Sequence, residues 1–197
     1  MPIKRALISV TDKTNLHILG PYLQDKGVEI ISTGGTLKYL KQHGVKAVDI
    51  ANFTGQPEIM DGRVKTLHSN VFGGILGRRG IDDDLMTESN ILPIDLVIVN
   101  LYKFSDAIAK NGCTMDDAVE SIDIGGPSLL RASAKNYKDV VVLCDPSDYS
   151  MFMTKNDFKD GVDLEQRLRY AQKVFTHTGM YDTTISQYMF HSLFKSL

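Results

Sequence analysis

The sequence predicts an α/β protein in which a parallel β-sheet is the middle of three layers and is flanked by helices, with a helical C-terminal part. In the first fifty residues, short apolar runs alternate with segments whose leucines recur at helical spacing, an order typical of a helix-covered parallel sheet. Residues 95–100 add a strand with a continuous apolar centre, which indicates burial on both faces. From Leu164 onward, apolar residues follow helical spacing, with an interruption expected at Gly179.

The elements of the first half follow from this alternation. Strands are expected at residues 6–10, 28–32 and 46–50, and the two helices between them end near Gly27 and Gly44, residues that commonly terminate helices. Residues 51–80 are rich in glycine and show little periodicity, so an irregular segment is expected there. Its apolar side chains argue against disorder.

The second half continues the same pattern. We expect a surface helix at 82–90, two helical pieces around Cys113, a helix at 128–136 with Pro127 at its first position, a strand at 139–143 and a helix starting at 145–147. No repeat or linker divides the chain, which indicates one domain over residues 1–197.

Composition excludes several classes of function. The net charge of −2, without a long basic run, argues against nucleic-acid binding as the main role. Two widely spaced cysteines favour a reducing, cytoplasmic setting, and the sequence contains no signal peptide or stretch apolar enough to span a membrane. No metal-ligand spacing and no Gly-x-Gly-x-x-Gly motif occur, so neither a metal nor a dinucleotide cofactor is expected.

The segment 61–68, Asp-Gly-Arg-Val-Lys-Thr-Leu-His, is the strongest candidate for a binding site. If it is extended, Arg63 and Lys65 point to one face, with Val64 on the other, and two cations on one face suit a phosphate. The alternative is a solvated basic turn, since exposed lysine and arginine are common.

Further polar loops follow the predicted strands. In parallel sheets, ligands bind outside the carboxyl ends of the strands, where residues 11–13, 32–36, 100–102 and 123–126 would converge. Gly34 and Gly35 open a helix and suit an anion, although an ordinary capped turn is the alternative. Taken alone, Lys13 and Lys135 are ordinary helical surface lysines.

Together, six ordered motifs carry a resemblance. The chain resembles the IMP cyclohydrolase domain, the N-terminal half of the bifunctional enzyme that also carries AICAR formyltransferase activity. The motifs span residues 9–14, 32–36, 61–68, 100–102, 123–126 and 134–136. The resemblance implies the methylglyoxal-synthase-like fold and the closure of FAICAR to IMP with loss of water, without a cofactor or metal. The formyltransferase half is absent from this sequence.

The resemblance also implies residue roles. Lys135 matches the proton donor or acceptor, and Lys65, Tyr102 and Asp123 match its partners at the ring. The residues that match nucleotide-binding positions are Thr11, Asp12, Lys13, Thr33, Gly34, Gly35, Thr36, Arg63, Val64, Thr66, Val99, Asn100, Ile124 and Gly125. Of these, Lys13, Arg63 and the Gly34-Gly35 turn are expected at the 5′-phosphate. Lys103 and Ser69 stand where the family usually has proline, which affects the expected shapes of two loops.

Two other functions remain open at this point. The same fold serves as a regulatory nucleotide- or phosphate-binding module, and it also supports a methylglyoxal-synthase-type lyase that acts on a triose phosphate. The resemblance further implies a homodimer, with FAICAR and IMP as ligands and a functional link to an AICAR formyltransferase.

Overall fold

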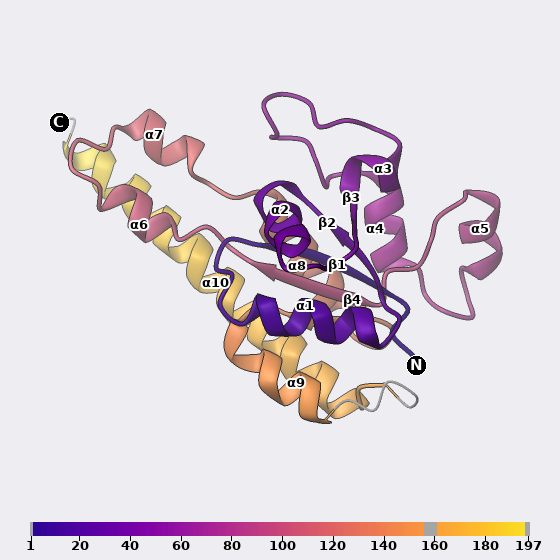
Figure 1. The fold of residues 1–197 in the computed structure, drawn as a ribbon. Coiled ribbons are helices and arrows are strands. Elements are labelled where there is room, and N and C mark those ends of the chain that lie inside the picture. Colours follow the sequence, from indigo (N-terminus) through magenta and orange to yellow (C-terminus); the bar gives the residue numbers. More distant parts are fainter. Residues whose placement is uncertain (1, 156–160, 196–197) are drawn as a thin grey trace.

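A five-stranded parallel sheet organises the protein, as the sequence predicts (Figure 1). The computed structural model describes residues 2–155 and 161–195. The strand order is β3-β2-β1-β4-β5, and the strands are β1 (Arg5–Val10), β2 (Glu29–Ser32), β3 (Ala47–Asp49), β4 (Leu96–Asn100) and β5 (Val141–Leu143). All neighbouring strands pair in parallel, so the carboxyl ends of the strands form one edge of the sheet, here called the carboxyl edge.

Helices cover both faces of the sheet. On one side, α1 (Leu16–Asp25) packs against α2 (Gly34–Gln42) and α9 (Tyr149–Lys155); on the other, α8 (Gly125–Lys135) packs against α4 (Ser69–Leu76) and α10 (Leu164–Lys195) (Figure 1). Shorter elements complete the chain: α3 (Ile50–Thr54), α5 (Asp83–Glu88), α6 (Phe104–Ile108), α7 (Met115–Glu120) and the 3₁₀ helix η1 (Pro146–Asp148). The side chains of Leu7, Ile8 and Ile98 are fully buried between these layers, as the continuous apolar runs predict.

The expected irregular segment at 51–80 is shorter than predicted. It contains α3 and α4, so the stretch without a helix runs from 55 to 68. The glycines that suggested a loop lie inside α4, where a Cβ on Gly74 would approach the Leu92 carbonyl oxygen to 2.5 Å and one on Gly73 would approach the Ile91 side chain to 2.8 Å. These glycines let the helix pack closely against the chain that leads into β4.

Two further helix boundaries differ from the prediction. Helix α8 begins at Gly125, before Pro127, because the first turn of a helix does not require the proline N–H group. Helix α10 runs without interruption through Gly179. A glycine inside a helix costs about 1 kcal/mol relative to alanine, which the buried face of a long helix outweighs.

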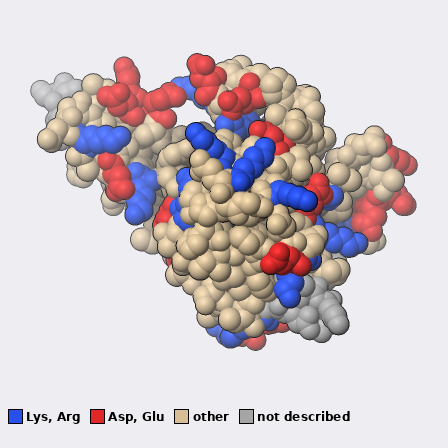
Figure 2. Space-filling view, in the orientation of Figure 1, with Lys and Arg blue, Asp and Glu red and all other residues tan. Residues whose placement is uncertain are grey.

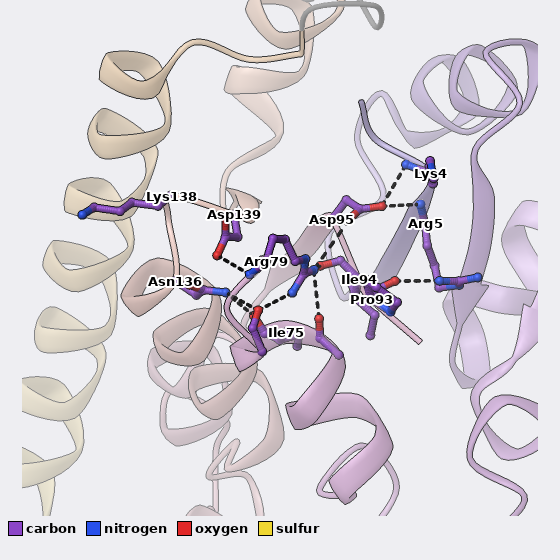
Figure 3. A network of polar contacts seen from close by, with 12 residues as sticks. Lys4, Arg5, Ile75, Arg79, Pro93, Ile94, Asp95, Asn136, Lys138 and Asp139 are labelled. Atoms are coloured by element: carbon purple, nitrogen blue, oxygen red, sulfur yellow. Dashed lines mark hydrogen bonds and ion pairs between the residues drawn. The ribbon is translucent and has the colours of Figure 1, made fainter. Parts of the chain in front are cut away.

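The amino ends of the strands are closed by a polar network around Arg79 (Figure 3). Its guanidinium donates to the carbonyl oxygens of Gly74 at 3.1 Å and Ile94 at 2.9 Å, and it lies 3.7 Å from the Asp95 carboxylate. The Asn136 side chain donates to the Ile75 carbonyl oxygen at 2.8 Å in the same network. The end of α8 is thereby fixed at this opposite edge, here called the amino edge.

Acidic residues gather over the short outer helices. On the face drawn in Figure 2, basic and acidic side chains are interspersed, and acidic groups concentrate over α7 and α5. The first turn of α7 contains Asp116 and Asp117, and that of α5 contains Asp83 and Asp84. The positive end of the helix dipole stabilises carboxylates at these positions. Within residues 2–155 and 161–195, no helix combines the length and apolar character needed to cross a bilayer.

Candidate active site

The loops after β1 and β4 are joined at the carboxyl edge by Asn100. Its side-chain oxygen accepts the backbone N–H groups of Thr11 at 2.7 Å and Asp12 at 2.9 Å, and its amide nitrogen donates to the Asp12 carbonyl oxygen at 2.8 Å. The Lys13 ammonium donates to the Thr11 carbonyl oxygen at 3.2 Å. Asn100, expected at a nucleotide-binding position, therefore shapes the loop that carries three other predicted residues.

Hydroxyl groups join the loops after β1 and β2. Thr36 donates to the Val10 carbonyl oxygen at 2.9 Å and accepts the Val10 N–H at 3.0 Å, while Ser9 and Thr33 share a hydrogen bond of 2.9 Å. Thr33 and Thr36 are buried, so both stabilise the loops from within. Gly34 begins α2 with φ of 44°, a left-handed value that glycine adopts without strain.

Residues 61–68, here called the site loop, form a turn at their start in place of the extended segment considered from sequence. Val64 pairs with Ile59 across a tight reversal in which Met60, Asp61 and Gly62 all have positive φ. Val64 therefore holds the reversal closed.

Both cations of the site loop have carboxylate partners. Arg63 forms an ion pair with Glu120 of α7, and Lys65 forms one with Glu58, just before the reversal. The Lys65 ammonium also lies 3.6 Å from the position that a Cβ on Gly34 would occupy. Lys65 is thus beside the start of α2, where backbone N–H groups and the helix dipole favour an anion.

The next residue of the site loop contacts the start of a second helix. Thr66 is buried, and its hydroxyl oxygen lies 3.0 Å from where a Cβ on Gly125 would be. The site loop therefore passes between the N-termini of α2 and α8. Two helix N-termini with one lysine between them form a strongly anion-favouring region.

Asp123 lies at the start of α8, with its carboxylate close to the loop after β4. The carboxylate accepts the Gly126 N–H at 2.8 Å and the Tyr102 N–H, and the Asp123 N–H donates to the Tyr181 hydroxyl oxygen at 2.7 Å. Burial raises the pKa of Asp123 above its usual range, and the two backbone hydrogen bonds oppose this only in part. A half-buried carboxyl with a raised pKa is suited to exchange protons with a ligand.

Other predicted residues lie around this centre. The Tyr102 ring is exposed, next to Asp123, and Ile124 is exposed in the turn before α8. Val99 is buried in β4 and pairs with Ser9, so its side chain belongs to the core. Throughout the described part of the chain, no group of three or more His, Cys, Asp or Glu side chains is arranged to hold a metal ion.

Lys135 lies apart from these residues within one chain. It ends α8, and eleven residues at a rise of 1.5 Å place it about 15 Å from Gly125. Its neighbours include Ala134, Leu168 and Phe175, which line a groove between α8 and α10 near the amino edge. The other three residues expected at the ring, Lys65, Tyr102 and Asp123, lie on the carboxyl edge.

Sequence reasoning missed three contacts of this site. Glu58 and Glu120 pair with the two cations, and Tyr181 contacts Asp123 from α10. Tyr181 falls within the helix expected from Leu164 onward, and no spacing in the sequence connects it with residue 123. The only signal for the glutamates is that an exposed cation generally finds a carboxylate.

Comparisons with known proteins divide the chain into two matched segments. The model of the MGS-like domain matches residues 19–128, and the model of the AICARFT/IMPCHase bienzyme matches residues 133–196. A solved structure entitled "Crystal structure of ForH" is similar over nearly the whole chain. It is 35% identical with a TM-score of 0.84, and the similarity covers 93% of this chain and 95% of that one.

Proposed function

Because the chain belongs to the MGS-like domain family and carries the AICARFT/IMPCHase match at residues 133–196, we propose that it is an IMP cyclohydrolase, acting as one domain over residues 1–197. The bienzyme match supports an enzymatic role in purine biosynthesis. The observation that carries the finer proposal is the site loop between the starts of α2 and α8, with Asp123 beside it. This arrangement offers separate positions for a phosphate and for a reacting ring.

The reaction sets clear chemical demands. The carboxamide nitrogen of FAICAR must lose a proton as it attacks the formamido carbon, the oxygen on that carbon becomes negative, and it must leave as water. Both reacting groups belong to one molecule, so the enzyme mainly has to fix their orientation and move protons.

The phosphate is proposed to bind at the start of α2. Gly34 and Gly35 would donate backbone N–H groups, and Lys13 and Arg63 would supply positive charge. Glu120 forms an ion pair with Arg63, so an incoming phosphate has to displace it, and Glu58 forms one with Lys65 beside this position. The Arg63–Glu120 pair is exposed, and such pairs contribute no more than about 1 kcal/mol, which a charged phosphate readily exceeds.

The ring is proposed to bind among Lys65, Tyr102, Asp123 and the start of α8. With its raised pKa, Asp123 is a stronger base toward the attacking nitrogen than an ordinary exposed carboxylate. The N–H group of Gly125 at the start of α8 is proposed to stabilise the developing oxyanion, since the Gly126 N–H is already bonded to Asp123. Thr66, packed against Gly125, would then hold the site loop at the distance that this arrangement requires.

Lys135 requires a second chain if it moves a proton in this reaction. Within one chain it lies about 15 Å from Gly125, which no lysine side chain can bridge. A symmetric dimer in which α8 of one chain approaches the carboxyl edge of the other would bring Lys135 of one chain close to Lys65 of the other. This agrees with the expectation of a homodimer.

Steady-state conversion of FAICAR to IMP by the 197-residue chain tests the activity, beside Lys65→Ala and Asp123→Ala. We expect wild-type turnover and a loss of about 100-fold or more in kcat for each folded variant. Methylglyoxal formed from dihydroxyacetone phosphate would support the lyase, and tight IMP binding without turnover would support a regulatory module. Either result would overturn the proposal.

Mixing inactive variants tests the second-chain role of Lys135. If Lys65 and Lys135 act from different chains, a mixture of Lys65→Ala and Lys135→Ala chains should regain about a quarter of the wild-type activity, since half of the dimers are mixed and each has one intact site. If both lysines act from one chain, the mixture stays inactive. A Lys135→Ala chain with full activity would remove Lys135 from the mechanism.

A further inference from the structure

Helix α10 fastens two loops at the carboxyl edge. Lys173 donates to Asp145, which follows β5, at 2.8 Å, and two turns further along the helix Tyr181 accepts the Asp123 N–H at 2.7 Å. Figure 1 shows α10 running along the domain from α9 to α6 and α7. The helix therefore supports the candidate site from outside the sheet.

The contact of Tyr181 with Asp123 differs from the other contacts of this helix. The tyrosine is 9% exposed, so its ring is packed and its oxygen has a fixed position. Asp123 is held on both sides: its N–H donates to Tyr181, and its carboxylate accepts the N–H groups of Gly126, at 2.8 Å, and of Tyr102. These bonds fix both its backbone and its side chain.

This hydrogen bond also joins the two matched segments of the chain. Asp123 lies within residues 19–128, which match the MGS-like domain, and Tyr181 lies within residues 133–196, which match the bienzyme. The second segment therefore contributes a direct contact to a residue of the first that is expected to take part in the reaction. Through a contact of this kind, a fold that serves several functions can be adapted to one reaction.

We propose that Tyr181 is a positioning residue, which sets the location of the Asp123 carboxylate by accepting the hydrogen bond of its backbone N–H. The inference rests on the proposed cyclohydrolase function. Tyr181 acts through Asp123 and has no need to contact the substrate itself. Its removal should therefore impair the chemical step more than substrate binding.

The test uses Tyr181→Phe, which removes the oxygen and keeps the ring. We expect kcat for FAICAR closure to fall by about 10- to 100-fold, as for a displaced catalytic group, while KM changes less than about twofold. The matched control is Tyr170→Phe, on the same helix, 4% exposed and about three turns away, which should leave kcat within about twofold. A normal kcat for Tyr181→Phe, or an equal loss in the control, would overturn the proposal.

Two further measurements separate this inference from the proposed function. Combined with Asp123→Ala, Tyr181→Phe should cause no further loss of kcat, because a positioning residue has nothing left to position. Independently of turnover, exchange of the Asp123 amide proton in D₂O should become about tenfold faster in Tyr181→Phe than in wild type. An inactive wild type would refute the cyclohydrolase alone, whereas unchanged amide exchange would refute the role of Tyr181 even in an active enzyme.

Discussion

Replacing Gly126 by alanine should displace the Asp123 carboxylate more than a substitution at a neighbouring position would. A Cβ at this position would lie 2.5 Å from the Asp123 Oδ2 atom and 2.7 Å from Leu101 Cδ2. Ordinary contacts between heavy atoms are about 3.5 Å, so the carboxylate has to move by about 1 Å. The Leu101 methyl group is the end of a flexible side chain and can turn away at little cost.

The expected effect on stability is modest and the effect on activity is large. Overpacking costs about 1–3 kcal/mol, and the higher helix propensity of alanine returns up to about 1 kcal/mol, so the free energy of unfolding should fall by about 1–2 kcal/mol. A shift of about 1 Å in a reacting group lowers turnover by about 100-fold. Activity should therefore fall far more than the loss of folded protein explains.

Urea denaturation and FAICAR turnover measure the two effects separately. The matched control is Gly179→Ala in α10, where a Cβ would meet nothing within 4 Å, and it should gain about 0.5–1 kcal/mol with unchanged turnover. If the Gly126→Ala protein keeps its kcat within about twofold of wild type, the position of Asp123 does not limit the reaction and the reasoning fails.

Three further predictions concern charge. Arg79→Met should lower the free energy of unfolding by about 3 kcal/mol in urea, because it removes the guanidinium donor from the buried carbonyl oxygens of Gly74 and Ile94. Exposed Arg78→Met should change it by less than about 1 kcal/mol, and equal effects would refute this. Burial raises the pKa of Asp145, but hydrogen bonds from Lys173 and Ser147 outweigh it and bring that pKa to about 2. These contacts therefore stabilise the fold above pH 3.8, and this stabilisation is lost as pH falls toward 2. Lys173→Met, partly exposed and screened, should therefore cost about 1 kcal/mol at neutral pH and nothing near pH 2, and a cost independent of pH would contradict this. Burial raises the pKa of Asp123 in the folded protein, so the free energy of unfolding should decline as pH rises above 3.8. Asp123→Asn should weaken this decline. Parallel curves of unfolding free energy against pH for the two proteins would count against it.

The sheet was predictable from sequence because parallel strands that are buried on both faces consist of continuous runs of apolar residues. The predictions at Gly74 and Gly179 were wrong because glycine occurs in turns, at close contacts between helices and also inside helices. Such uses differ only in the surroundings of the residue, which the local sequence does not contain.

The site was predictable in part for a related reason. Loops that follow neighbouring parallel strands meet at one edge, so Asn100 was correctly expected beside the loop after β1. The distance of Lys135 from that edge depends on where α8 begins and ends, and the local sequence defines the ends of a helix only to within one or two residues. The contact of Tyr181 with Asp123 spans 58 residues and depends on how α10 packs, which no motif records.

The position of β1 in the sheet has a consequence for the order in which the protein folds. β1 pairs with β2 from Arg5 and Glu29 onward, but its other neighbour begins with Leu96, opposite Ala6. During synthesis, one side of this central strand has no partner until about ninety more residues have been made, and the loop that closes it is long. The nascent chain therefore carries an open, apolar strand edge while those residues are being made, and chaperone protection should matter most in that interval.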